Sequence, residues 1–219
     1  TFKTLPYDPR KDFAPVGMIG QSPFIIAVHA DLPVKNLAEL IAHAKANPGK
    51  LSVATEGTRT FSGLMAAMFA RTAGVNIVSV PYSGVSPSIL DTITGRTQLV
   101  VQSSAALSPH LKTLRPIAVT SAKRLPTLSG TPTLAEVFPG FQYVGWHAVV
   151  APQQTPAAII QRVNRDLDGA LKDAEMSRRF AELGIVSEGA GTPAQLGEFI
   201  AAEHVRWSKL AKEVGVVAD

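Results

Sequence analysis

Short apolar runs alternate with helical patterns along residues 51–120 of the 219-residue sequence. Such alternation places strands side by side, because each helix carries the chain back along the sheet to the start of the next strand. The pattern therefore predicts an α/β fold with a parallel sheet and right-handed crossovers. The expected strands are 51–54, 77–81, 99–101 and 116–120, and the expected helices between them are 60–72 and 86–94.

The segments before and after this region predict further extended structure. Apolar runs at 13–19 and 24–29 predict one extended crossing segment, and the run at 143–151 predicts the strand that returns. Asn36 followed by Glu39 matches a capping box, which predicts a helix start just after residue 36.

Two Thr-Pro pairs predict helix starts in the last third of the chain. In Thr155-Pro156 and in Thr192-Pro193, a hydroxyl that can cap the helix precedes a proline at the first helical position. We therefore expect helices over 155–172 and 192–214, with Trp207 on the apolar face of the second. Shorter helices at 134–138 and 174–183 and a strand at 185–186 complete the expected elements.

The composition is that of a globular protein, with 46% hydrophobic and 17% charged residues. A chain of this length suits one large domain or two small lobes. The 21 Lys and Arg residues are scattered and nearly balanced by 17 Asp and Glu. We therefore expect no nucleic-acid partner, since tracking a phosphate backbone needs a denser basic stripe. The absence of cysteine excludes disulfides and thiolate metal sites. No apolar run reaches the roughly 18 residues of a membrane-spanning helix.

The stretch from Ile77 to Leu90 predicts a buried strand that turns at once into a helix, with Ser83 and Gly84 at the turn. The first N–H groups of a helix lack internal partners and carry partial positive charge, so they can hold an anion without a lysine. We expect the carboxylate of a small ligand at this point. The alternative is that 81–86 is an ordinary strand-to-helix loop that binds nothing.

Small polar residues follow the other expected strands as well. Because the carboxyl ends of parallel strands share one edge of the sheet, we expect these loops to lie together. Their amides and hydroxyls suit a carboxylate, since fixed donors replace its water shell, whereas a metal would need clustered carboxylate or imidazole ligands. The expected ligand-binding residues are Thr55, Gly57, Thr58 and Arg59 in the first loop, Tyr82, Ser83 and Gly84 in the second, and Gln102 and Ser103 in the third.

Two roles stay open for Arg59. The guanidinium could form a bidentate pair with a second carboxylate of the ligand, or the side chain could be a solvated loop residue.

The sequence favours a binding protein over an enzyme. It has no Gly-x-Ser-x-Gly elbow, no His-Glu-x-x-His pair and no Gly-x-x-x-x-Gly-Lys phosphate loop. His147 is expected to be buried and hydrogen-bonded rather than catalytic. Asp8, Asp12 and Asp91 have no partner at a spacing suited to paired acid and base work. We therefore expect no catalytic residue, no cofactor and no metal site.

Several motifs occur in an order that resembles one known family. The motifs are Leu5-Pro6-Tyr7-Asp8-Pro9 with Lys11–Val16, then Val80-Pro81-Tyr82-Ser83-Gly84, and last the Trp146 strand that ends in Ala151-Pro152 before Thr155-Pro156. In this combination the chain resembles the tripartite tricarboxylate transporter receptors, also called Bug-type solute-binding proteins, through nearly its whole length.

The resemblance implies a type II periplasmic-binding-protein fold, the Venus flytrap, with two lobes joined by crossing strands. Lobe 1 would comprise 1–20 and 146–219, and lobe 2 would comprise 21–145. It implies an extracytoplasmic receptor that captures a di- or tricarboxylate or an aromatic carboxylate and delivers it to membrane permease subunits. The implied location is the periplasm, although the chain itself carries no signal-peptide pattern. Carried over by position, the ligand contacts fall on the loop residues named above.

Three features depart from the family pattern. Relatives carry a longer N-terminal region that supplies part of the ligand cage, so lobe 1 is expected to be incomplete here. Arg59 and Gly63 stand where the family has glycine and histidine. Gln98 and Gln102 stand where aspartate is common, and glutamine can donate to a carboxylate whereas aspartate would pair with an ammonium group. We therefore predict a ligand without an amino group.

Two other functions stay open. The chain could be an orphan or truncated binding-protein domain that associates with itself or a partner through sheet edges and apolar surface left by the absent region. A hydrolase is the less favoured alternative. Stabilisation by a ligand would favour the receptor, turnover of esters or phosphates the hydrolase, and a stable dimer without ligand response the association domain.

Overall fold

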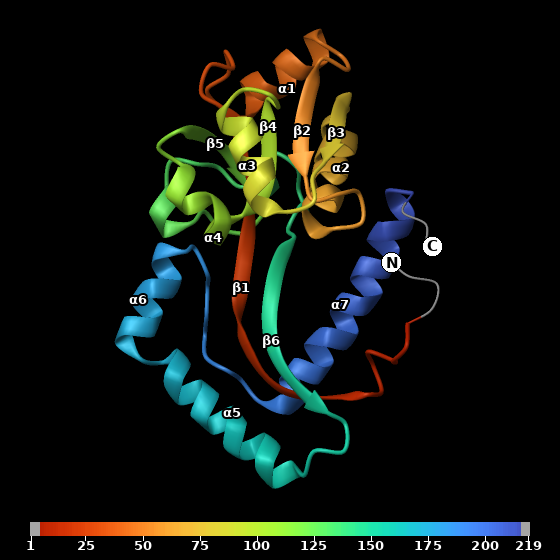
Figure 1. Ribbon diagram of the computed structural model, residues 1–219, viewed down its shortest axis with the longest axis vertical. Coiled ribbons are helices and arrows are strands. Elements are labelled where there is room, and N and C mark those ends of the chain that lie inside the picture. The colour runs from red at the N-terminus through yellow and green to blue at the C-terminus, as the bar shows by residue number, and fades with distance from the viewer. Residues whose placement is uncertain (1–4, 216–219) are drawn as a thin grey trace. The chain divides into compact units, whose positions relative to one another are not determined.

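The computed structural model describes residues 5–215. Its strands form a sheet in the order β3 (Ile77–Pro81), β2 (Leu51–Thr55), β4 (Leu99–Ser103), β1 (Phe13–His29) and β5 (Leu114–Val119), and β6 (Val144–Pro152) pairs with β1 off this path (Figure 1). The chain divides into two units. Unit 1 contains the described residues up to Gln21, Trp146–Ala181 and those from Ile185 onward; unit 2 contains Ser22–Gly145 and Glu182–Gly184. Strands β1 (Phe13–His29) and β6 (Val144–Pro152) contribute residues to both units. Residues 1–4 and 216–219 of the expected first lobe lie outside the described residues.

The strands of unit 2 confirm the predicted alternation. They are β2 (Leu51–Thr55), β3 (Ile77–Pro81), β4 (Leu99–Ser103) and β5 (Leu114–Val119). β2 lies between β3 and β4 and is parallel to both. β3 has the predicted bounds. β2 and β4 begin where predicted and end one and two residues later, and β5 begins two residues earlier and ends one residue earlier.

β1, which was expected only as a crossing segment, runs antiparallel to both of its neighbours in the sheet. Phe24 of β1 lies opposite Ser103 of β4, and Ile25 lies opposite Val119 of β5, both in antiparallel register. Apolar periodicity indicates that a segment is extended but not which way it runs, so the alternation alone could not predict this strand's direction. The sheet is therefore mixed, with β1 inserted between β4 and β5.

Helices cover both faces of the unit 2 sheet. α3 (Val85–Ile93) and α4 (Ser104–Leu107) pack on the face that carries Ile25, Ala54 and Val100. α1 (Leu37–Ala46) contacts β5, and α2 (Phe61–Ala73) contacts β2, β3 and β4 from the face opposite to α3 (Figure 1). Three short 3₁₀ turns lie at Ser108–His110, Pro126–Leu128 and Leu134–Glu136.

The helix start predicted at Asn36 is confirmed. The backbone N–H of Glu39 donates to Asn36 Oδ1 at 2.9 Å, and the Glu39 carboxylate accepts from the backbone N–H of Lys35 at 2.7 Å. The cap therefore satisfies a helix amide that has no partner within the helix.

The helices of unit 1 are α5 (Ala157–Leu171), α6 (Ala174–Glu182), whose last residue belongs to unit 2, and α7 (Pro193–Glu213). Thr192 caps α7 as predicted, with Pro193 at the first position and Gln195 completing a capping box. The same prediction is wrong for Thr155. α5 begins two residues later with Pro156 as its N-cap, and Pro156 has no side chain that can accept the first amides.

Three further expectations for unit 1 need correction. His147 is exposed rather than buried, and no other residue of β6 is fully buried. Trp207 is half-buried, and its indole N–H donates to Glu203 Oε2 at 2.7 Å, so it is only partly a core residue. The expected strand at 185–186 is reduced to a single bridge between Val186 and Gln21.

Unit 1 buries little apolar surface compared with unit 2. Among the described residues, its fully buried apolar side chains are Val16, Ile160, Leu171, Ala190, Leu196 and Leu210, while the much longer remainder of the buried core belongs to unit 2. Ile159 and Val205 are 52% and 69% exposed on helices α5 and α7. A folded unit of this size normally buries a larger core.

Candidate functional site

The predicted site residues come from loops that follow three strands at one edge of the unit 2 sheet. Thr55 at the end of β2 lies opposite Pro81 at the end of β3, and Ala54 lies opposite Val100 of the parallel neighbour β4. Tyr82 continues the pairing beyond β3, since its backbone N–H donates to the carbonyl of Thr55 at 2.8 Å. The carboxyl edge of the sheet therefore collects the loops, as predicted.

The first loop is shaped by hydrogen bonds inside the protein. Thr55 is buried, and its Oγ1 accepts from the N–H of Gly57 at 3.2 Å. The carbonyl of Gly57 accepts from Thr60 Oγ1 at 2.8 Å, and Thr60 then caps α2. Thr58 and Arg59 are exposed at the tip of this loop. The Thr55 hydroxyl therefore supports the loop, and the groups at the loop surface are those of Thr58 and Arg59.

Gly63, where the family pattern has histidine, holds the loop close to α2. A Cβ atom at this position would lie 2.0 Å from the carbonyl oxygen of Gly57, far inside van der Waals contact. Gly57 itself has φ +114°, a backbone conformation that side-chain-bearing residues rarely adopt. The first loop therefore depends on two glycines, one for its turn and one for the close approach of α2.

The second loop leaves four successive backbone amides without a protein partner. Within residues 5–215, no acceptor lies in hydrogen-bond geometry with the N–H of Ser83, Gly84, Val85 or Ser86. Gly84 is the N-cap of α3 and offers no side chain to accept from the first turn. The amides therefore combine with the helix dipole to make a point of positive potential at the sheet edge.

In the third loop, the predicted residue Gln102 is buried under α3 and does not reach the protein surface. Gln102 is 1% exposed, and its Nε2 donates to Ser88 Oγ at 3.3 Å. Ser88 Oγ donates in turn to the carbonyl of Val85 at 2.6 Å, which ties the first turn of α3 to β4. Ser103 caps α4 by accepting from the N–H of Ala106. The side chains of Gln102 and Ser103 thus already have protein partners.

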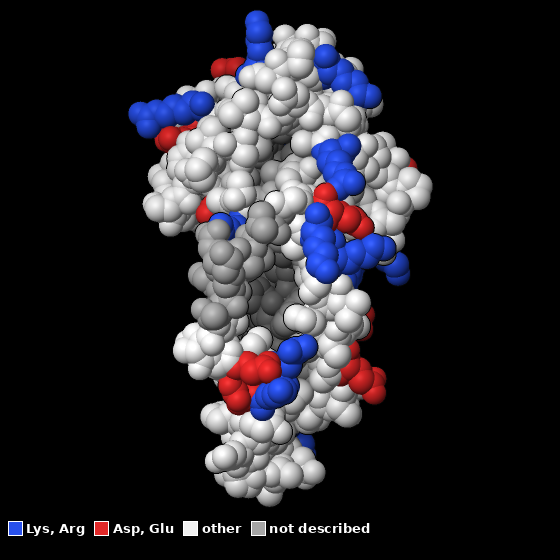
Figure 2. Space-filling model, turned by 90° about the vertical axis from the view of Figure 1, so that its right-hand side faces the viewer, with Lys and Arg blue, Asp and Glu red and all other residues white. Residues whose placement is uncertain are grey.

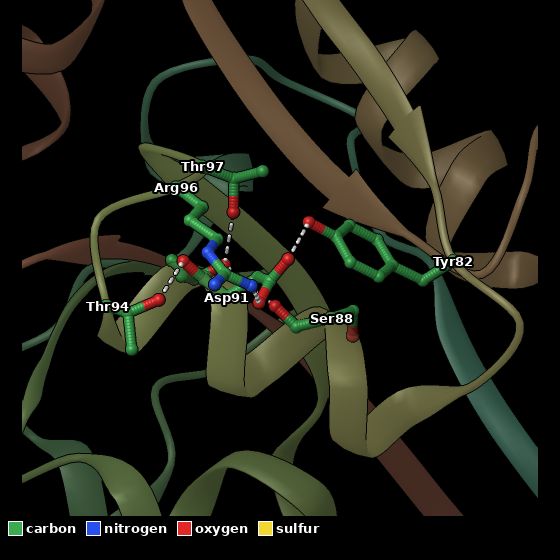
Figure 3. Close-up of polar contacts among 7 residues, drawn as sticks. Tyr82, Ser88, Asp91, Thr94, Arg96 and Thr97 are labelled. Carbon is green, nitrogen blue, oxygen red and sulfur yellow. Dashed lines mark hydrogen bonds and ion pairs between the residues drawn. The ribbon is translucent and has the colours of Figure 1, made fainter.

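The Tyr82 side chain is also engaged within unit 2. Its hydroxyl donates to Asp91 Oδ2 at 2.9 Å, and Asp91 Oδ1 accepts from Arg96 Nη1 at 3.0 Å (Figure 3). Burial, followed by the hydrogen bond to Asp91, raises the pKa of the Tyr82 phenol above its usual value. The phenol therefore stays protonated at neutral pH and remains a donor to Asp91.

Sequence reasoning missed this role of Asp91 and misplaced Gln98. Asp91 lies in α3 and Arg96 lies just past its end, so a carboxylate near a helix end with an arginine five residues later was the available signal. Gln98 precedes Leu99 at the start of β4, at the end of the strand away from the loops. Its Oε1 accepts from the backbone and hydroxyl of Ser52. Gln98 therefore does not belong to the candidate site.

We also looked among the described residues for a metal site, a basic surface and a membrane-spanning helix. No group of three or more His, Asp or Glu residues within 5–215 is arranged to hold a metal ion. On the face shown in Figure 2, Lys and Arg are interspersed with Asp and Glu and form no continuous basic stripe. None of the described helices is both long enough and apolar enough to cross a membrane.

The sequence of this chain is similar to those of known proteins. Residues 1–216 match the family described as Tripartite tricarboxylate transporter family receptor. The chain belongs to this family. Curated members from Pseudomonas sp. strain P51, Agrobacterium vitis and Bordetella pertussis, the last named BugT, are 32–34% identical over 97–100% of the chain. The chain spans 63–66% of the length of these relatives.

Several solved structures share the fold of this chain. Rpa4515 of R. palustris, solved with adipate, is 34% identical with a TM-score of 0.92, over all of this chain and 74% of its own. The periplasmic binding protein BugD is 28% identical, with a TM-score of 0.88 and the same coverage. MatC of Rhodopseudomonas palustris, solved with malate, is 25% identical with a TM-score of 0.82, over 95% of this chain and 73% of its own. The predicted periplasmic-binding-protein fold is confirmed, and the family is one of receptors rather than enzymes.

Proposed function

We propose that this receptor captures a small dicarboxylate in the periplasm and presents it to the permease subunits of a tripartite tricarboxylate-type transporter. The amides from Ser83 to Ser86, which have no acceptor among residues 5–215, carry the proposal, because these groups lie where a carboxylate is best held without a cation. Family membership supports the transport role, and the adipate and malate held by two related structures support the ligand class. Units 1 and 2 are the proposed counterparts of the two lobes.

Within the proposed site, the nine predicted residues take different roles. Ser83 and Gly84 supply amides, together with Val85 and Ser86. The Thr58 hydroxyl and the Arg59 guanidinium are the groups of the first loop that could reach a second carboxylate. Thr55, Tyr82, Gln102 and Ser103 shape the loops through the hydrogen bonds described above, and Gly57 provides the turn.

Isothermal titration calorimetry with a matched ligand set tests the proposal. We expect adipate and malate to bind, and adipamide, which keeps the length of adipate but carries no charge, to bind far more weakly. The absence of an amino group from the ligand remains a prediction, which 2-aminoadipate tests against adipate. Binding of adipamide as tight as that of adipate would contradict a site built for carboxylates.

A second candidate, self-association, is favoured by one observation. Unit 1 has the small buried core described above, and Ile159, Val163 and Val205 on its helices are at least 40% exposed. Apolar surface of this kind is often covered in an assembly. Light scattering over a range of protein concentrations distinguishes self-association from the receptor function. A stable dimer that does not respond to any carboxylate favours self-association.

A further inference from the structure

Tyr82 is fixed at both of its ends. Its backbone N–H donates to Thr55 at the end of β2, and its hydroxyl donates to Asp91 in α3. The ring between these ends packs against the buried cluster that includes Ala54 and Ile89. One residue thus connects the sheet, the core and the helix at the point where the chain leaves β3.

Asp91 is held in place by the turn that ends α3. Its second carboxylate oxygen accepts from Arg96, and its backbone carbonyl accepts from Thr94 Oγ1 at 3.2 Å and from the N–H groups of Arg96 and Thr97 at 2.9 and 3.3 Å (Figure 3). The Arg96 guanidinium also balances the negative charge that Asp91 places on the helix. The Tyr82 hydroxyl therefore meets an acceptor whose own position is fixed.

The start of α3 differs from the other helix starts of unit 2. Asn36, Thr60 and Ser103 each cap their helix with a side-chain oxygen, which fixes the approach of the preceding loop. Gly84 provides no such cap for α3. A capping side chain there would occupy the amides that the proposed ligand needs, so the loop must be held from elsewhere. The contact between Tyr82 and Asp91 is placed to do this.

We propose that Tyr82 and Asp91 are positioning residues of the acid site, which fix the loop before α3 so that the amides of Ser83–Ser86 stay open and oriented toward the ligand. The inference rests on the proposed function for the identity of the ligand. Its physical basis is pre-organisation: a site whose donors are already ordered loses less conformational entropy when it binds. Neither side chain needs to touch the acid.

Four single variants of the full chain test the inference. Tyr82→Phe keeps the ring and its packing but removes the donor, and Asp91→Ala removes the acceptor. Asp91→Asn keeps an oxygen that can accept from Tyr82, so it is the conservative rescue. Asn47→Ala removes a side-chain hydrogen bond to the backbone carbonyl of His43 at the end of α1, outside the Tyr82–Asp91 contacts, so it is the control.

We expect the adipate dissociation constant to rise roughly tenfold in Tyr82→Phe and Asp91→Ala, the loss of one hydrogen bond to a charged group. Asp91→Asn should recover most of the affinity, and Asn47→Ala should bind as the unchanged protein does. A general loss of structure would lower the melting temperature of every affected variant and would not be rescued by Asp91→Asn. Equal affinity in Tyr82→Phe and the unchanged protein would overturn the inference.

A measurement without ligand separates this inference from the proposed function. ¹⁵N relaxation of the free protein should give order parameters near 0.85 for the amides of Gly84, Val85 and Ser86, and values that fall toward roughly 0.6 in Tyr82→Phe. Unchanged order parameters overturn the positioning role whatever the titrations show. If the unchanged protein binds no carboxylate while Tyr82→Phe still loosens these amides, the proposed function fails and the structural role of Tyr82 stands.

Discussion

Individual residues at the sheet edge serve mainly to shape the loops, and a few backbone groups remain for a ligand. The side chains of Thr55, Tyr82, Gln102 and Ser103 are all engaged by protein partners. Sequence reasoning could place these residues at the edge because strand ends are readable from apolar runs. It could not tell a surface donor from a buried one, because that depends on which neighbour each side chain meets after folding.

Gly63 allows a direct test of the first loop. We expect Gly63→Ala to lower the free energy of unfolding by roughly 1–3 kcal/mol, because the new methyl group meets the Gly57 carbonyl and forces α2 and the loop apart. Urea denaturation measures the change. Gly130→Ala is the control in the same unit: no atom lies within 4 Å of its Cβ position, so its effect should stay within about 0.5 kcal/mol. Equal stability of both variants would contradict the close contact.

At the scale of elements, helix caps show where local sequence is sufficient and where it is not. Thr192 and Thr155 both precede a proline, yet Thr192 caps α7 and Thr155 does not cap α5. The difference lies three residues further on. Gln195 Oε1 accepts from the backbone N–H of Thr192 and completes the capping box of α7, whereas Ala158, at the equivalent position of α5, has no polar side chain. The Thr-Pro pair alone was therefore an incomplete signal.

The two threonines make a matched pair of variants. Thr192→Ala should reduce the free energy of unfolding by about 1 kcal/mol, the usual cost of losing a helix cap. Thr155→Ala should change it by no more than about 0.5 kcal/mol, because Thr155 is only half-buried and its hydroxyl caps no helix. Chemical denaturation of both variants side by side provides the comparison, and a larger loss in Thr155→Ala would show that the start of α5 is misplaced.

The 3₁₀ turn Leu134–Glu136 gives a prediction about pH. Glu136 Oε1 and Oε2 accept from Arg124 Nε and Nη2 at 2.8 and 2.6 Å, and Oε1 also accepts from the N–H of Thr133. The Arg124 hydrogen bonds, followed by the backbone N–H of Thr133, lower the pKa of Glu136 from 4.5 to about 2. Since the folded-state pKa lies below that of the unfolded chain, this stabilisation is present above about pH 4.5 and is lost as the pH falls toward 2.

Thermal melts of Glu136→Gln and of the unchanged protein between pH 7 and pH 3 measure this contribution. The variant should have the lower melting temperature at pH 7, and the difference between the two proteins should narrow as the solution becomes acidic. Arg124→Gln should reproduce the effect, because it removes the same ion pair. A difference that stays constant with pH would show that the carboxylate of Glu136 is not the cause.

At the scale of the whole molecule, the two units contrast in how much of their fold is supported by their own core. Most of the alternating strands and helices of unit 2 were predictable because they bury a face against the sheet. β3 is the exception: its bounds were predicted, but the expectation of a buried strand was wrong, since none of its residues is fully buried. Unit 1 was predicted less well: β6 has no fully buried residue, His147 is exposed, and the strand at 185–186 is a single bridge. A prediction from apolar periodicity assumes that the apolar face of each element is covered by the rest of the protein. It is less reliable in unit 1, where the described residues leave much of that face exposed.

The proposed receptor role depends on one arrangement, an acid bound by the backbone amides at the start of α3. Titrating ¹⁵N-labelled protein with adipate and following the backbone amide signals tests it most directly. We expect the largest shifts at Ser83, Gly84, Val85 and Ser86, and small shifts when adipamide replaces adipate. If these four signals stay unchanged while adipate binds elsewhere in the chain, or if no signal responds at millimolar adipate, the acid site is not where the structure places its open amides.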